Sequence, residues 1–371
     1  MAKLDSSSLE VLSSDLQYPE GPVHCRDGSI ILVEIKGEQL SVVGPGGGPA
    51  KKLADLKGGP NGAAAGPDGK IYVCNDGGFS WEPIPLPNKQ ELWIGGNQPA
   101  DYTGGSLQSV DTSTGVVTTL YTECTARENP PGTAAPDWDP AFELRGPDDL
   151  VVDEVGGIWF SDWGKSRERE RDITGVYYAS ADGKSIKQMI YPLNAPNGIA
   201  LSPDGKRLYV ALTFERKILY YDIPEPGVIK PNSVTGPDQG TIDGSNLLTA
   251  NLVGQSVLDS MAVDAEGNVY AATMLPNGNN PMSNGGISVI SPDGDVEYVP
   301  IQLPNSDFAP LPSNICFGGE DMKTAYITCG ASGYLISMRS EIPGLELNCN
   351  GSHFDLQQMP TTENNAGEEA Q

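Results

Sequence analysis

Hydrophobic and polar residues follow one recurring phrase along this chain. The phrase begins with a small residue or proline and a polar residue, continues through small apolar residues to a turn such as Asp-Gly, and ends in an alternating strand. One clear copy is APNGIALSPDGKRLYVAL, at residues 195–212. Asp-Gly readily supplies the positive φ that a hairpin turn needs, so each copy predicts two antiparallel strands. The other five copies occupy residues 18–35, 59–76, 146–162, 258–274 and 312–329.

The six copies predict an all-β fold. Further strands follow most copies and bring each unit to four, as at residues 218–223, 286–290 and 334–338. Six such units around one axis bury their faces against one another and need no helices. We therefore predict a six-bladed β-propeller over residues 16–357. An N-terminal segment, residues 1–15, precedes it, and a flexible tail, residues 358–371, follows it.

A long insertion separates the second and third copies. Their equivalent polar positions lie 87 residues apart, whereas the other intervals run from 41 to 62 residues. The insertion, about residues 77–145, contains a strand pair at 106–110 and 116–121 and a proline-rich run. Two interpretations stay open: an irregular connection with packing aromatics, or a lid over one mouth of the propeller. Its tryptophans are Trp81, Trp93 and Trp138.

Composition narrows the class of protein. The 45 Gly and 31 Pro fit frequent turns, and 23 Lys and Arg against 49 Asp and Glu leave a net charge of −26. Such a polyanion repels nucleic acid and anionic membranes, so neither is an expected partner.

No apolar run approaches the roughly 20 residues that cross a bilayer. The N-terminus lacks the apolar core of a secretory signal, and six scattered cysteines fit a reducing compartment, so we expect a cytoplasmic protein. Oligomeric state is not predicted.

One polar residue opens each copy at the same place in the phrase. If each lies at the start of an innermost strand, all six point toward one end of the central channel. Carboxylate and amide oxygens are the ligands of calcium, whereas two histidines in the whole chain disfavour a zinc set. The plain alternative is that Asn and Asp begin strands because they suit turns, but this does not explain a glutamate. The six residues are Glu20, Asn61, Asp148, Asn197, Asp259 and Asn314.

The phrases YPEGP, GPDDLVVDEVGGIWFSD, PNGIALSPDGKRLYVA and DSMAVDAEGNVYAA resemble the SMP-30/gluconolactonase/LRE-like family of six-bladed, calcium-dependent propellers. The resemblance covers roughly residues 16–340. It implies one divalent metal, usually calcium, with Mg²⁺, Mn²⁺ or Zn²⁺ left open. The implied ligands are Glu20, Asp148, Asn197 and Asp259.

Two departures from the gluconolactonase pattern bear on the substrate. Most gluconolactonases carry Pro-Asn-Asp where this chain has Pro147-Asp148-Asp149, and Asp-Gly where it has Asp259-Ser260. Both features are more similar to the drug-responsive lactonase branch of the family, which hydrolyses aromatic and other non-sugar lactones. A third carboxylate among the implied ligands also makes the site more anionic, which favours a divalent ion.

The resemblance implies a lactone hydrolase. A divalent cation would polarise the lactone carbonyl for attack by water. Asp259 is the expected general base, and direct nucleophilic attack by Asp259 is the competing role. Two other functions stay open: a phosphotriesterase-type hydrolase on the same site, or a non-enzymatic calcium-binding propeller. The residues expected to contact substrate are Asn61, Asp149, Trp163, Ser260, Met274 and Asn314.

One segment between the third and fourth copies is densely charged. The run KSRERERD, residues 165–172, mixes both signs of charge. Such a run is typical of a solvated loop, and we interpret it so.

Overall fold

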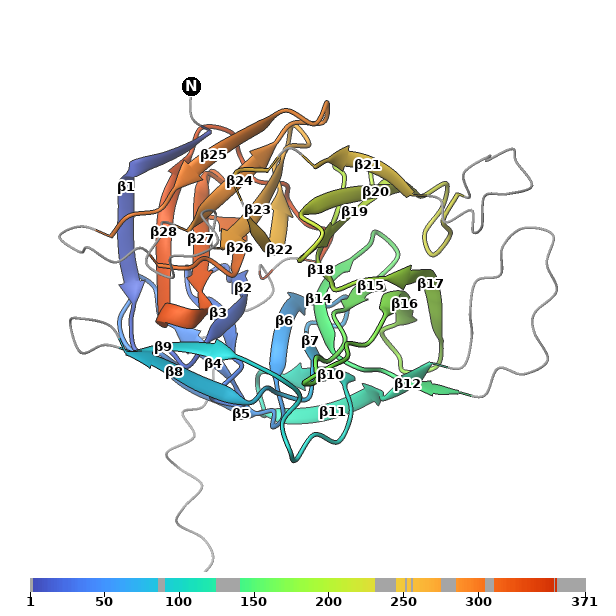
Figure 1. Cartoon of the computed structure of the whole chain (residues 1–371). Helices are drawn as coiled ribbons and strands as arrows, with labels where there is room; N and C mark the ends of the chain where they lie inside the picture. The colour runs from blue at the N-terminus through green and yellow to red at the C-terminus, as the bar shows by residue number, and fades with distance from the viewer. Residues whose placement is uncertain are drawn as a thin grey trace, which may run out of the picture.

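The computed structural model describes residues 3–85, 91–124, 141–230, 245–250, 252–254, 256–274, 285–303, 310–349 and 351. Six four-stranded antiparallel sheets surround a central axis (Figure 1). Over the described ranges the single helical element is the 3-10 turn η1 (Gly330–Ser332), and no helix there is long and apolar enough to span a membrane. The predicted all-β, six-bladed propeller is confirmed.

Each blade begins with a strand that lines the axis and ends at the rim. The first blade contains β2 (Pro19–His24), β3 (Ile30–Glu34), β4 (Gln39–Val43) and β5 (Lys51–Asp55), and the second contains β6 (Pro60–Ala65), β7 (Ile71–Asn75), β10 (Ser106–Asp111) and β11 (Val116–Tyr121). The third blade contains β14 (Pro147–Val152), β15 (Gly157–Asp162), β16 (Thr174–Ser180) and β17 (Ile186–Leu193), and the fourth contains β18 (Pro196–Leu201), β19 (Arg207–Leu212), β20 (Lys217–Asp222) and β21 (Ser245–Thr249). The last two contain β22 (Val257–Val263), β23 (Val269–Met274), β24 (Gly286–Ile290) and β25 (Val296–Pro300); and β26 (Asn314–Gly318), β27 (Thr324–Cys329) and β28 (Tyr334–Ser340), with β1 (Leu4–Ser13) outermost.

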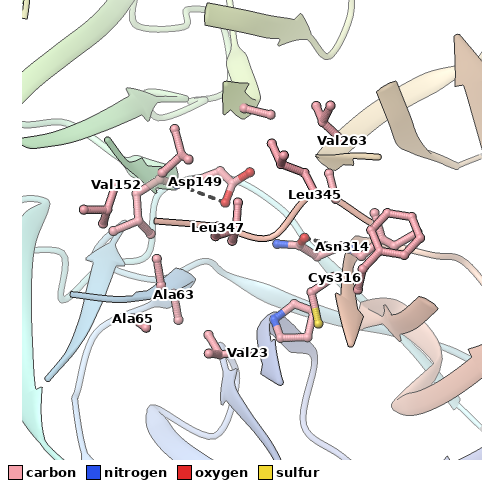
Figure 2. Close-up of a pocket in the computed structure, with 18 of the residues that line it drawn as sticks. Val23, Ala63, Ala65, Asp149, Val152, Val263, Asn314, Cys316, Leu345 and Leu347 are labelled. Carbon is pink, nitrogen blue, oxygen red and sulfur yellow. Dashed lines mark hydrogen bonds between the residues drawn. The ribbon is translucent and has the colours of Figure 1, made fainter. Parts of the chain in front are cut away.

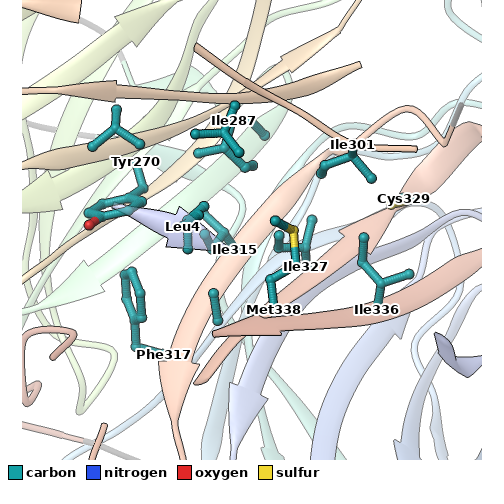
Figure 3. Close-up of a cluster of buried hydrophobic side chains, with 14 of the residues drawn as sticks. Leu4, Tyr270, Ile287, Ile301, Ile315, Phe317, Ile327, Cys329, Ile336 and Met338 are labelled. Carbon is teal, nitrogen blue, oxygen red and sulfur yellow. The ribbon is translucent and has the colours of Figure 1, made fainter. Parts of the chain in front are cut away.

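The N-terminal strand β1 closes the ring. It pairs antiparallel with β28, so the first and last segments of the chain share one sheet. Leu4 is buried in the apolar core between the fifth and sixth blades, with Tyr270, Ile315 and Met338 (Figure 3). The propeller therefore begins at Leu4, and not at residue 16 as the repeat indicated.

Two excursions account for the long insertion. The strands that we placed inside it, β10 and β11, are the outer strands of the second blade. The first excursion carries the hairpin of β8 (Trp81–Pro85) and β9 (Glu91–Gly95), and Leu92 of this hairpin packs on Leu311 and Ala331. The second carries β12 (Glu123–Cys124) and β13 (Phe142–Glu143). Trp138 and the proline-rich run lie outside the described residues, as does the predicted tail.

Residues 343–349 and 351 lie across the end of the channel at which the innermost strands turn into the second strands of their blades. Their backbone bonds to three blades: Leu345 N donates to Val263 O at 2.9 Å, Gly344 N to Met322 O at 2.8 Å, and Arg26 N to Gly351 O at 3.2 Å. A cavity of about 120 Å³ remains inside the channel beneath them. Figure 2 shows Leu345 and Leu347 in this cavity, with Asp149 and Asn314. No disulfide joins the six cysteines, all of which are described.

Candidate metal centre

The six polar residues predicted from the repeat all lie at the starts of the innermost strands. In five of the six, the antiparallel register shifts directly at or after the polar residue, as between Glu20 and Val23 or between Pro147 and Leu150. A bulge of this kind turns a side chain out of the regular alternation. In three of the six copies a glycine follows the polar residue and allows close approach of the next blade: a Cβ on Gly198 would lie 2.7 Å from the carbonyl oxygen of Asp259. The repeated phrase thus brings neighbouring blades together at this end.

Glu20 and Asp148 each present one carboxylate oxygen without a partner. Glu20 is 1% exposed, and its Oε2 accepts hydrogen bonds from Gly21 N and Asn314 Nδ2, both at 2.8 Å. Asp148 is 3% exposed, and its Oδ2 accepts from Asn61 Nδ2 at 3.2 Å. Glu20 Oε1 and Asp148 Oδ1 are buried and accept no hydrogen bond. Buried polar atoms are almost always satisfied, so two orphaned carboxyl oxygens fit the ligands that a cation would need here.

Asn197 and Asp259 complete the predicted ligand set. The Asn197 side chain is buried, hydrogen-bonds to the Asp259 carboxylate and accepts from Ser260 Oγ at 3.4 Å. Asp259 differs from the other three because it is only partly buried. It is therefore the predicted ligand best placed to meet a substrate or water.

Burial and mutual repulsion shift the acidity of these groups. Burial raises the pKa of Glu20 to about 7. It also raises the pKa of Asp148 and of Asp259 well above the usual range, with further contributions from neighbouring carboxylates. Asp149 behaves similarly, because burial raises its pKa to about 8. The protein alone disfavours the ionised forms, and a bound divalent cation would favour them.

The donor set fits a hard cation better than a soft one. Among the described residues no group of three or more His, Cys, Asp or Glu is gathered closely enough to hold a metal ion. A cation held by Glu20, Asp148 and Asp259 would therefore also need the amide oxygen of Asn197 and water as ligands, and the three carboxylates would have to draw closer around it. Mixed carboxylate, amide and water oxygens are the coordination that calcium accepts.

The residues expected to contact substrate have different surroundings. Asn61 and Asn314 donate their amide N–H groups to Asp148 and Glu20, so they orient carboxylates. The Asp149 carboxylate accepts from the backbone N–H groups of Leu150 at 3.0 Å and Ile199 at 3.2 Å. Ser260 lies beside Asn197, and Met274 packs on the apolar cluster of Leu92, Leu311 and Ala331.

Trp163 belongs to a row of five rings that the sequence did not reveal. Each ring centroid lies between 5.1 and 6.0 Å from the next. Trp163 directly follows Asp162, which pairs with Pro147 beside Asp148, so this row lies at the same end of the blades as the polar ring. Separations of this size are typical of favourable aromatic contacts. We call this row the aromatic arc; its members are Tyr18, Trp81, Phe79, Trp163 and Phe214.

The prediction that residues 165–172 form a solvated loop is wrong for Lys165. Lys165 is fully buried, and its Nζ lies 3.0 Å from Asp76 Oδ1. Burial lowers the pKa of Lys165, while the neighbouring Asp76 opposes that shift. Arg171 is also engaged, since its guanidinium stacks 3.6 Å from the Trp163 ring centre. Charge pattern alone could not reveal these contacts, because the partners come from other segments.

The fold is a six-bladed propeller with a ring of carboxylate and amide side chains at one end of its channel. The model of the SMP-30/gluconolactonase/LRE-like region matches residues 18–331, and the chain belongs to this family. It is 25% identical over 368 residues to a gluconolactonase of Zymomonas mobilis, covering 91% of this chain and 83% of the relative. It is 28% identical over 283 residues to a lactonase drp35 of Staphylococcus saprophyticus, covering 72% of each. These names confirm the predicted class of enzyme, the lactone-hydrolysing propellers.

Solved structures show the same fold. A gluconolactonase from Xanthomonas campestris superposes with a TM-score of 0.60 at 20% identity, covering 90% of this chain and 89% of that one. Regucalcin from Agrobacterium tumefaciens, described as a calcium-binding protein, superposes with a TM-score of 0.60 at 17% identity, covering 91% and 97%. Both likenesses concern the arrangement of the blades.

Proposed function

We propose that this chain is a calcium-dependent lactonase that opens a small, non-sugar lactone. The observation that carries the proposal is the pair of unpartnered, buried oxygens of Glu20 and Asp148, which lie at the same end of the blades as the aromatic arc. The lactonase relatives and the calcium-binding structural neighbour support the reaction and the metal.

The aromatic arc favours an apolar substrate over a sugar. Its rings present faces and edges to one another, and Phe214 at its end is 51% exposed. Apolar walls with a few polar groups at one point are typical of sites for small hydrophobic ligands. A polyhydroxylated lactone would instead need many hydrogen-bond partners, because each hydroxyl buried without one is costly.

The chain's own residues would perform the proton transfers. Calcium bound by Glu20, Asp148, Asn197 and Asp259 would supply Lewis acidity for the ring carbonyl. Asp259, only partly buried and held by Asn197, accepts a proton from the attacking water and returns it to the ring oxygen when the acyl–oxygen bond breaks. The product is a hydroxy acid that ionises at neutral pH. A nucleophilic Asp259 would instead form a mixed anhydride with the acyl carbon while the ring oxygen leaves as an alkoxide that takes up a proton, and water would then hydrolyse the anhydride to release the hydroxy acid.

A turnover screen tests this proposal. Purified protein is given a benzo-fused six-membered lactone, a sugar lactone and a phosphotriester, and acid release is followed with a pH indicator, with and without a chelator. We expect the benzo-fused lactone to be hydrolysed fastest, activity to be lost with chelator, and calcium to restore it. Faster phosphotriester turnover would assign the site to that chemistry. Calcium-dependent stability without turnover of any substrate would indicate a binding protein.

A further inference from the structure

Lys165 is a buried cation at the acidic end of the channel. Its side chain is 1% exposed, and its Nζ donates to Asp76 Oδ1 at 3.0 Å and to Gly78 O at 2.7 Å. The same ammonium lies 4.1 Å from the centre of the Phe79 ring. Because removing a charge from water is costly unless it is well paired, these contacts hold Lys165 and Asp76 in one arrangement.

Asp76 links Lys165 to a predicted calcium ligand. Its Oδ2 accepts from Asn61 Nδ2 at 3.4 Å, and the same nitrogen donates to Asp148 Oδ2 at 3.2 Å. An amide NH₂ carries two hydrogens, so it can serve both carboxylates. A continuous chain of contacts therefore runs from Lys165 through Asp76 and Asn61 to Asp148.

This chain sets which way the Asn61 amide faces. With its nitrogen between two carboxylates, Asn61 occupies one oxygen of Asp148 and leaves Oδ1 unpartnered. Asn314 does the same for Glu20, but its amide is oriented by the backbone, because Ile315 N donates to Asn314 Oδ1 at 2.7 Å. At the Asn61 position, the Asp76 carboxylate takes the place of that backbone contact, and its Oδ1 is held both by Lys165 Nζ and by Gly78 N, which donates to it at 2.5 Å.

We propose that Lys165 is a positioning residue for calcium binding, acting through Asp76 and Asn61 to present one oxygen of Asp148 to the ion; this rests on the cation site of the proposed function. Without Lys165, Asp76 moves, the Asn61 amide rotates and Asp148 loses its orientation. Simple electrostatics gives the opposite expectation, because removing a positive charge near a cation would tighten calcium binding. The sign of the change therefore separates positioning from repulsion.

Calcium titration of the full chain tests the proposal. Lys165→Met keeps an unbranched apolar stem and removes the charge. Lys184→Met is the matched control, since Lys184 forms an exposed ion pair with Asp182 at 2.8 Å. We expect calcium affinity to fall about tenfold or more in Lys165→Met, with hydrolysis recovering at saturating calcium, and to stay within about twofold in the control. Unchanged or tighter binding by folded Lys165→Met would overturn the proposal.

Asn61→Ala provides a second test, because it breaks the chain of contacts while leaving the buried ion pair intact. We expect the same loss of calcium affinity, and no further loss when Lys165→Met is added, since both changes act on one path. Unaltered affinity in Asn61→Ala contradicts the inference even if Lys165→Met does not fold. Absence of calcium binding by the unmodified chain would contradict the proposed function as well, which distinguishes the two failures.

Discussion

Asn61 and Asn314 occupy the same positions in the repeat as predicted metal ligands, but each of them orients a neighbouring carboxylate. Both occupy the same place in the repeated phrase as Glu20 and Asp148, and all four are buried. Their amide nitrogens face the carboxylates, so their contribution is to occupy one oxygen of each and leave the other for an ion. The ring of six predicted positions therefore contains two kinds of residue with complementary tasks.

Trp163 provides the residue-scale test of substrate class. Its ring lies between Phe79 and Phe214, and Nε1 donates to Thr213 Oγ1 at 3.1 Å. We expect Trp163→Ala to raise KM for a benzo-fused lactone about tenfold, because a lost ring contact and its buried area amount to about 1–2 kcal/mol. KM for a small aliphatic lactone should change less than about threefold. Steady-state kinetics on both substrates measures this.

Trp93→Ala is the matched control, because Trp93 lies outside the arc, under Lys36 at 3.8 Å from the ring centre. It should leave both KM values nearly unchanged. An equal loss for both lactones in Trp163→Ala would show that the arc does not select the substrate.

The sequence located the polar ring but could not assign partners within it. The repeated phrase places Glu20, Asp148 and Asn197 in register, so their convergence follows from radial symmetry. The roles of Asp76 and Lys165 could not be predicted, because Asp76 is the last residue of its copy of the phrase, Lys165 lies in a loop outside the phrase, and the two meet only across two blades. The mixed charges after Lys165 favoured a solvated loop, and tertiary contact overrode that pattern.

At the scale of elements, β1 was the largest feature that the repeat did not reveal. It is the outermost strand of the sixth blade, and the repeated phrase marks only the two innermost strands of each blade. Its sequence, rich in serine, has a weak apolar alternation, and only Leu4 and Ser13 are buried. β10 and β11 were predicted as strands, but the β8–β9 hairpin that precedes them concealed their place in the second blade.

Leu4 tests whether β1 contributes to the core. It is 1% exposed among the side chains of Figure 3, so Leu4→Ala leaves a cavity between the fifth and sixth blades. We expect a loss of about 2–5 kcal/mol in the free energy of unfolding. Val11→Ala on the same strand, where the side chain is 46% exposed, should cost less than about 1 kcal/mol. Urea unfolding of both variants measures this, and equal stabilities would contradict the role given to β1.

At the scale of the whole molecule, the net charge of −26 is accompanied by a group of buried acidic side chains at one end of the channel. Most acidic residues remain in water, but burial raises the pKa of Glu20 to about 7 and of Asp149 to about 8. A carboxyl group whose folded pKa lies above its unfolded value stabilises the fold at low pH and loses that contribution as pH rises through the folded value. The metal-free protein should therefore lose stability as the pH rises from about 4, near the unfolded pKa of these groups, to about 8, and calcium has most to add at the upper end of this range.

The same raised pKa values determine the direction in which calcium affinity changes with pH. Calcium favours ionised carboxylates, so binding displaces protons from groups that hold them in the metal-free protein. Affinity should therefore increase as the pH is raised from about 6 to 8.

The most direct test of the central claim, that buried carboxylates from separate blades form one cation site, is a calcium titration of the metal-free chain beside Glu20→Gln. The account predicts one calcium per chain, tighter binding at about pH 8 than at about pH 6, and affinity about tenfold or more weaker in the variant, because Gln presents a neutral amide where Glu20 has an unpartnered oxygen. No saturable binding, or equal affinity of the two proteins, would contradict it.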